Sequence, residues 1–119
     1  MFLYVPAETE QFTFSVMANS PNEGGRVILH DPTGAEILVL DGDFDAQENH
    51  EVIVPAACRG AIWSITWAQP ETPGVHLEDI NMMLDGPLTP VLWIDRAWAE
   101  NYGEDLWRRH KAALEEEAQ

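Results

Sequence analysis

Basic residues are scarce in this chain, which has one lysine and five arginines among its 119 residues. Against them stand 21 aspartates and glutamates, so the formal net charge is −15. Proteins that bind nucleic acids neutralise phosphates with clustered lysine and arginine side chains. The composition therefore argues against a nucleic-acid partner.

Cysteines and long apolar runs are also few. Cys58 is the only cysteine, so no disulfide can form within the chain. No apolar run approaches the roughly 20 residues of a membrane span, and Met1–Pro6 lacks the basic and apolar regions of a signal peptide. We expect no membrane partner, and an exported chain would be part of a longer protein. The 45% hydrophobic content is enough for a packed core, unlike that of a disordered acidic tail.

Charge and proline are distributed unevenly along the chain. Residues 1–95 hold two basic residues against fifteen acids, a net charge of −13, whereas residues 96–119 hold four against six, a net charge of −2. All eight prolines lie at or before Pro90. We predict a β-sandwich domain over residues 1–95 and a helical appendage over residues 96–119. The acidic domain tolerates neutral partners such as sugars and attracts cations such as Ca²⁺, although the charge can also serve solubility alone.

Turn-forming residues divide the first 95 residues into short segments. Proline, glycine, asparagine and aspartate recur at near-regular intervals, and β-branched and aromatic runs lie between them. Such spacing is typical of an antiparallel sandwich or barrel. The strands are expected within 12–17, 26–30, 36–40, 51–54, 61–68, 75–84 and 91–94.

The alternation of residues predicts which side chains face the core. Phe12, Phe14 and Val16 share one face, and so do Trp63, Ile65 and Trp67. The runs 27–29, 37–40 and 52–54 are apolar on both faces. Something must cover their second face, or that face lies at an interface.

The tail contains a helical pattern that offers such a cover. Trp98, Tyr102, Leu106, His110 and Ala113 recur at spacings of three and four, and Trp107 and Leu114 widen the stripe. Gly103 weakens the middle, so two short helices are an alternative. We predict that this amphipathic tail packs on the sandwich or on a second copy; it could also continue into a further domain.

Several motifs resemble those of a known type of domain. They are Val5-Pro6, Asp31-Pro-Thr-Gly34, Val54-Pro55 and Gly60-Ala-Ile-Trp-Ser64, and the resemblance covers residues 2–90. In this order they are similar to the small jelly-roll accessory domains of large secreted bacterial proteins, often beside glycoside-hydrolase domains. The resemblance implies an all-β, antiparallel jelly-roll β-sandwich of the galactose-binding-like class, with a non-catalytic role that is commonly carbohydrate binding. It supplies no ligand residues, and it does not extend to the C-terminal helix.

Five tryptophans are candidates for sugar binding, because the apolar face of a sugar ring stacks on indole. Trp63 is expected in the core and Trp107 in the packing of the helix. We predict a ligand-binding platform of Trp67, Trp93 and Trp98. The alternative is that Trp93 and Trp98 attach the helix to the sheet.

A second candidate is an acidic loop. Asp41, Asp43 and Asp45 alternate in a predicted turn, as oxygen ligands of Ca²⁺ do. Ala46 and Val52 replace the glycine and glutamate of an EF-hand, so the loop is not one. It is predicted to hold a structural Ca²⁺, with a solvated acidic turn as the alternative.

Three functions follow as hypotheses. The first is a non-catalytic module of a secreted bacterial polysaccharide-degrading protein, located outside the cell or in the periplasm, that binds glycan by aromatic stacking. The second is a structural module that forms homodimers through its helix. The third is a small metal-dependent carbohydrate-active enzyme, which would need His30, His50 and His76 to converge on copper or zinc. The chain has no nucleophile elbow, P-loop or G-x-G-x-x-G motif.

Overall fold

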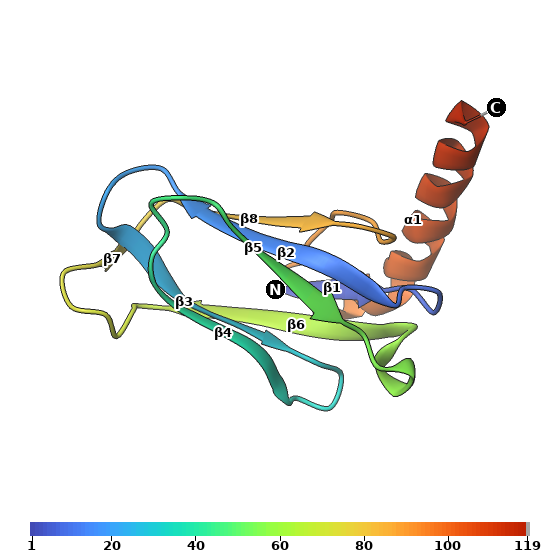
Figure 1. Cartoon of the computed structure of the whole chain (residues 1–119). Helices are drawn as coiled ribbons and strands as arrows, with labels where there is room; N and C mark the ends of the chain where they lie inside the picture. The colour runs from blue at the N-terminus through green and yellow to red at the C-terminus, as the bar shows by residue number, and fades with distance from the viewer. Residues whose placement is uncertain (119) are drawn as a thin grey trace.

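The computed structural model describes residues 1–118 as two β-sheets and a C-terminal helix (Figure 1). The sheets are mostly antiparallel, so the predicted two-layer, all-β body followed by a helix is confirmed. The elements are β1 (Phe2–Val5), β2 (Gln11–Ala18), β3 (Glu23–His30), β4 (Glu36–Asp43), β5 (Glu48–Ile53), the 3-10 helix η1 (Ala56–Cys58), β6 (Ala61–Ala68), β7 (His76–Leu77), β8 (Ile80–Asp85) and α1 (Arg96–Glu117).

The two sheets differ in size. The larger sheet has the strand order β1-β6-β3-β4, and β7 pairs with the start of β3. The smaller sheet has the order β5-β2-β8. Only the short β3–β7 pair is parallel among the described strands, and it joins Glu23 to His76 and Gly24 to Leu77.

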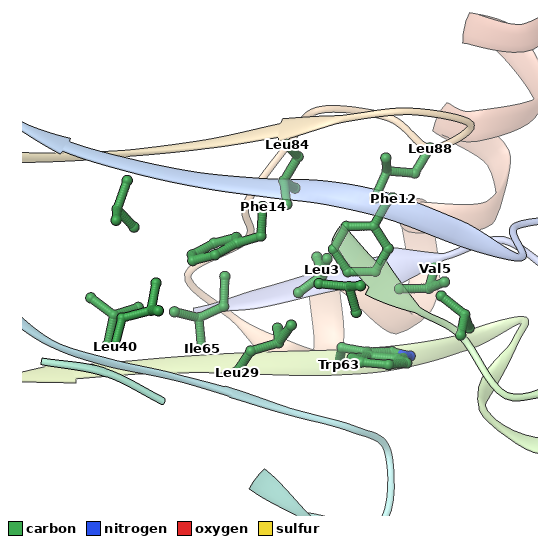
Figure 2. Packing of buried hydrophobic residues seen from close by; sticks show 14 of the residues in the cluster. Leu3, Val5, Phe12, Phe14, Leu29, Leu40, Trp63, Ile65, Leu84 and Leu88 are labelled. Carbon is green, nitrogen blue, oxygen red and sulfur yellow. The ribbon is translucent and has the colours of Figure 1, made fainter. Parts of the chain in front are cut away.

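The core lies between the sheets and is built from alternate residues of each strand (Figure 2). The larger sheet supplies Leu3, Leu29 and Ile65, and the smaller sheet supplies Phe14. Trp63 is fully buried; its Nε1 donates to the carbonyl of Cys58 at 2.9 Å. Phe12 meets its ring edge-on, with centroids 5.9 Å apart. The inward direction predicted for Phe12, Phe14, Val16, Trp63 and Ile65 is confirmed.

Three predicted segments differ from the structure. The run 75–84 is divided into β7 and β8, because Asp79 has a φ of 40° and breaks the extended backbone. Of the run 91–94, only Trp93 pairs, in an isolated bridge to Phe2. Asp41 and Asp43, expected in a turn, are the last residues of β4, where they pair with Arg26 and Gly24.

Helix α1 lies against β1 and also contacts β6 (Figure 1). It begins at the predicted boundary, where the side chain of Asp95 accepts a hydrogen bond from the Ala97 amide at 2.8 Å. It is one continuous helix, so the alternative of two short helices is wrong. The appendage was predicted to end at Gln119, which lies outside the described residues.

The face by which the helix docks matches the predicted stripe only in part: Trp107 packs inward as predicted. Ala99, Gly103 and Trp107 are the buried residues of α1, whereas Trp98 is 50% exposed and Tyr102 is 57% exposed. A Cβ atom on Gly103 would lie 2.6 Å from the Cβ of Tyr4. The absence of a side chain at Gly103 therefore lets the helix approach β1, one position away from the aromatic stripe.

The helix does not cover the strands that are apolar on both faces. Ile37 and Val39 on β4 remain exposed, and Ile53 on β5 is 65% exposed. The prediction that the tail packs on the sandwich is confirmed. It covers β1 instead of the runs for which a cover was expected.

Candidate functional site

The outer face of the smaller sheet is hollowed and largely polar, with Ile53 and Met83 as exposed apolar side chains. Phe12, Phe14 and Val52 point into the core, so the residues that alternate with them face outward. A hollow of about 670 Å³ lies on this face. It is lined by Thr13, Ser15, Gln47, Asn49, Glu51, Met83, Leu84 and Asp85.

The strand register arranges most of these side chains in two rows across the sheet. In the first row, Thr13 on β2 has Glu51 on β5 and Asp85 on β8 as its Cα partners. In the second row, Ser15 has Asn49 and Met83 as its partners. Cross-strand partners on one face lie side by side. The hollow therefore has an acidic row, Glu51–Thr13–Asp85, and a neutral row, Asn49–Ser15–Met83.

Hydrogen bonds hold the polar side chains of both rows in place. Glu51 accepts from the hydroxyl of Thr13 at 2.7 Å and from the amide of Gln11 at 3.3 Å. The Oδ1 of Asn49 accepts from the Ser15 hydroxyl and from Gln47 Nε2, both at 2.7 Å. Side chains that are already ordered lose less conformational entropy when a ligand binds.

The predicted tryptophans lie outside this hollow and on three separate segments. Trp67 is 46% exposed near the end of β6, and Trp98 lies on the first turn of α1. Trp93 is partly buried and exchanges backbone hydrogen bonds with Phe2 at 2.7 and 2.8 Å. Only Phe12–Trp63 and Trp107–His110 are in aromatic contact within residues 1–118. The platform of Trp67, Trp93 and Trp98 stays a prediction.

The carboxylate of Asp41 is occupied by hydrogen bonds within the protein. It accepts from the Glu71 amide at 2.9 Å, from the amide and hydroxyl of Thr72 at 3.0 and 2.7 Å, and from Arg26 at 3.3 Å. These donors, the Glu71 amide first, lower the pKa of Asp41 to about 2. Asp43 and Asp45 are exposed. Across the 118 described residues no group of three or more His, Cys, Asp or Glu side chains could hold a metal ion. Calcium at Asp41, Asp43 and Asp45 stays a prediction.

The histidines considered for a metal centre lie apart in the fold. His30 on β3 is within hydrogen-bond distance of the Gly34 carbonyl and the Thr66 hydroxyl, at 3.3 and 3.2 Å. His50 on β5 lies beside Glu48, with 3.5 Å between Nε2 and Oε1, and His76 is exposed on β7. Cys58 is buried near Asp31, and burial raises the pKa of its thiol above the ordinary value.

The chain matches no protein-family model, no curated protein and no solved structure. Along the described length, none of its helical structure combines the length and the apolar character that a membrane crossing requires.

The residues of the hollow were not predicted as a site. Their only local signal is the alternation of Thr13 and Ser15 on β2 and of Asn49 and Glu51 on β5. Strands β2, β5 and β8 are far apart in the sequence, and their register is set by tertiary packing.

Proposed function

We propose that this chain is a non-catalytic carbohydrate-binding module that holds a glycan on the outer face of its smaller sheet. The observation that carries the proposal is the hollow with its two ordered rows. Sugar hydroxyls both donate and accept hydrogen bonds, and ligand sites orient such groups with a few fixed polar side chains. Hydroxyl, amide and carboxylate groups of six residues line the hollow.

The apolar contact in this hollow comes from methionine. Met83 is 38% exposed at one end of the neutral row, and none of the described residues that line the hollow is aromatic. A flexible thioether can lie against the C–H face of a sugar ring. The proposal therefore relies on hydrogen bonds and Met83, and it replaces the aromatic stacking expected from Trp67, Trp93 and Trp98.

The wider context of the proposal rests on the resemblance of the strand and turn motifs. It supports a jelly-roll, galactose-binding-like class for the sandwich. It also supports a role as an accessory module of a longer, exported bacterial protein that degrades polysaccharides.

Affinity gel electrophoresis on a panel of soluble polysaccharides tests the proposal. We expect at least one polysaccharide to retard the protein, and the pair Asn49→Ala and Glu51→Ala to abolish the retardation. The matched control is Ser64→Ala with Thr66→Ala on β6 of the larger sheet, which should leave retardation unchanged.

Two results would contradict the proposal. Failure of every polysaccharide to retard the protein would contradict glycan binding. Loss of retardation in Trp67→Ala, Trp93→Ala and Trp98→Ala, with the Asn49 and Glu51 variants still retarded, would move the site to the tryptophans.

Self-association through α1 is a second candidate function. It is favoured by the exposed aromatic side chains of Trp98 and Tyr102 on one side of the helix. Sedimentation should then show a concentration-dependent dimer that Trp98→Ser with Tyr102→Ser converts to a monomer. A monomer at every concentration would remove this candidate.

A further inference from the structure

The negative charge of the hollow is concentrated in one of its two rows. Glu51 and Asp85 stand on either side of Thr13 in the acidic row, and the neutral row carries no charge. The Asp85 carboxylate accepts only a neutral hydrogen bond in residues 1–118, from the Gly86 amide at 3.0 Å. The donors to Glu51 are the neutral groups of Thr13 and Gln11.

Within residues 1–118 no lysine or arginine pairs with this row, because all six form their contacts with other groups. Arg26 on β3 pairs with Asp41 on β4 and with Glu71 in the β6–β7 loop. Arg59 donates to the Val54 carbonyl at 3.1 Å. The four basic residues of α1 pair with Glu8 or with acids of the helix itself; they are Arg96, Arg108, Arg109 and Lys111.

The two rows together suit a ligand with several polar groups, because a neutral row lies beside the acidic one. Neighbouring strands lie about 4.8 Å apart, so two strand spacings separate the Cα atoms of Glu51 and Asp85 by about 10 Å. The neutral row beside them offers amide and hydroxyl groups and the Met83 side chain. A fitting ligand therefore has a positive charge at one end and uncharged hydroxyl groups at the other.

We infer that the hollow selects an amino sugar, with a free ammonium group on the acidic row of Glu51 and Asp85 and an adjoining sugar ring over Asn49, Ser15 and Met83. This inference rests on the proposed function and names its ligand class. Uronic acids and other anionic sugars are repelled by the acidic row. Neutral sugars bind more weakly, because they have no positive charge to pair with the carboxylates of the acidic row.

Isothermal titration calorimetry of the full chain tests this selectivity at low salt with four tetrasaccharides. They are the tetramers of glucosamine, N-acetylglucosamine, glucose and galacturonic acid. We expect the glucosamine tetramer to bind at least about fivefold more tightly than the neutral ones, the scale of two exposed charge pairs. Galacturonate should show no binding.

Two pairs of isosteric substitutions distinguish the effect of the hollow's carboxylates on affinity from the effect of the protein's net charge. Glu51→Gln with Asp85→Asn should reduce the affinity for the glucosamine tetramer to that of the neutral tetramers. Glu36→Gln with Glu116→Gln changes the net charge equally, on β4 and near the end of α1, and should retain the preference.

Four outcomes would overturn the inference. Equal binding of neutral and glucosamine tetramers ends it but leaves the proposed function standing, whereas failure of all tetramers to bind contradicts both. If the Glu36 and Glu116 control loses the preference for the glucosamine tetramer, that preference comes from the net charge of the protein and not from the hollow. Binding of tetralysine with the same dependence on Glu51 and Asp85 shows that the hollow recognises charge without sugar.

Discussion

Two interfaces hold this molecule together, and they are built from opposite kinds of residue. Between the sheets, large side chains such as Trp63 and Phe12 fill the core, and both are almost completely buried. Between α1 and β1, the contact is made at Ala99 and Gly103, with Trp107 as the one large buried side chain of the helix.

The contact between α1 and β1 also depends on charge, whereas the core between the sheets does not. Glu8, in the β1–β2 loop, accepts from Trp107 Nε1 at 2.8 Å and from Lys111 Nζ at 2.7 Å. The core should therefore respond chiefly to changes of volume. The helix contact should respond to the shape of the side chain at Gly103 and to the ionisation of Glu8 and Lys111.

The largest loss of stability is expected from Trp63→Ala. Truncating a fully buried tryptophan typically costs about 3 to 5 kcal/mol of unfolding free energy, and here it also leaves the Cys58 carbonyl without its donor. Urea denaturation measures the loss. Trp67→Ala on the same strand is the control and should cost about 1 kcal/mol or less, because its ring is half exposed. Equal losses at both positions would contradict this account of the core.

A smaller loss of unfolding free energy is expected from Gly103→Ala. Alanine favours a helix over glycine by about 1 kcal/mol, but its methyl group would overlap Tyr4. Overpacking of this kind costs about 1 to 3 kcal/mol, so the net change in unfolding free energy should be a loss.

The matched control for Gly103 is Asn101→Ala, at an exposed position of the same helix. It should be neutral or slightly stabilising in the same urea experiment. A gain of stability in Gly103→Ala would show that the close approach to β1 does not limit packing.

Asp41→Asn tests a polar connection that lies outside both interfaces. The folded-state pKa of Asp41 is depressed to about 2 from 3.8, so the carboxylate stabilises the fold above pH 3.8 and this stabilisation is lost as the pH falls towards 2. The variant should melt several degrees lower at pH 7 and lose less of its stability between pH 4 and 2. Thermal melts over this range, with Asp43→Asn as the control, measure both changes.

The smallest effect is expected from Glu8→Gln. The bond to Lys111 lowers the pKa of Glu8 and raises that of Lys111. Stabilisation from Glu8 is therefore present above its unfolded-state pKa and lost as the pH falls through the depressed value. Stabilisation from Lys111 is present below its unfolded-state pKa and lost as the pH rises through the raised one.

The fluorescence of Trp107 should report this change at the helix contact. The wild type should show acid and alkaline transitions at low salt, and Glu8→Gln should show weaker ones. Glu10→Gln, two residues away and exposed, is the control. Identical profiles for all three proteins would show that charge does not hold the helix.

The strands with a clear period of two could be predicted from the sequence, because their buried faces alternate locally. Phe12, Phe14, Trp63 and Ile65 are examples, and the helix start at Asp95 has a cap that is equally local. The site could not be predicted in this way. Thr13 meets Glu51 and Asp85 only after β2 has acquired its two neighbours in a fixed register.

Apart from Trp107, the docking face of the helix was mispredicted, for a different physical reason. Trp98 and Tyr102 are the more apolar residues, so a hydrophobic pattern selects them. The sheet instead accepts Ala99 and Gly103, because close approach of the backbone requires small residues there. A sequence shows which residues are apolar enough to be buried, but it does not show the shape of the surface on which they pack.

The two ends of α1 should loosen at very different rates. Asp95 caps the first turn, but Glu115, Glu116 and Glu117 lie at the negative end of the helix dipole, and the last turn has no basic residue. Backbone amides near Leu114 should therefore exchange with deuterium well before those near Ala99. Fraying would begin at the C-terminal turn and stop where Lys111 and Trp107 hold Glu8.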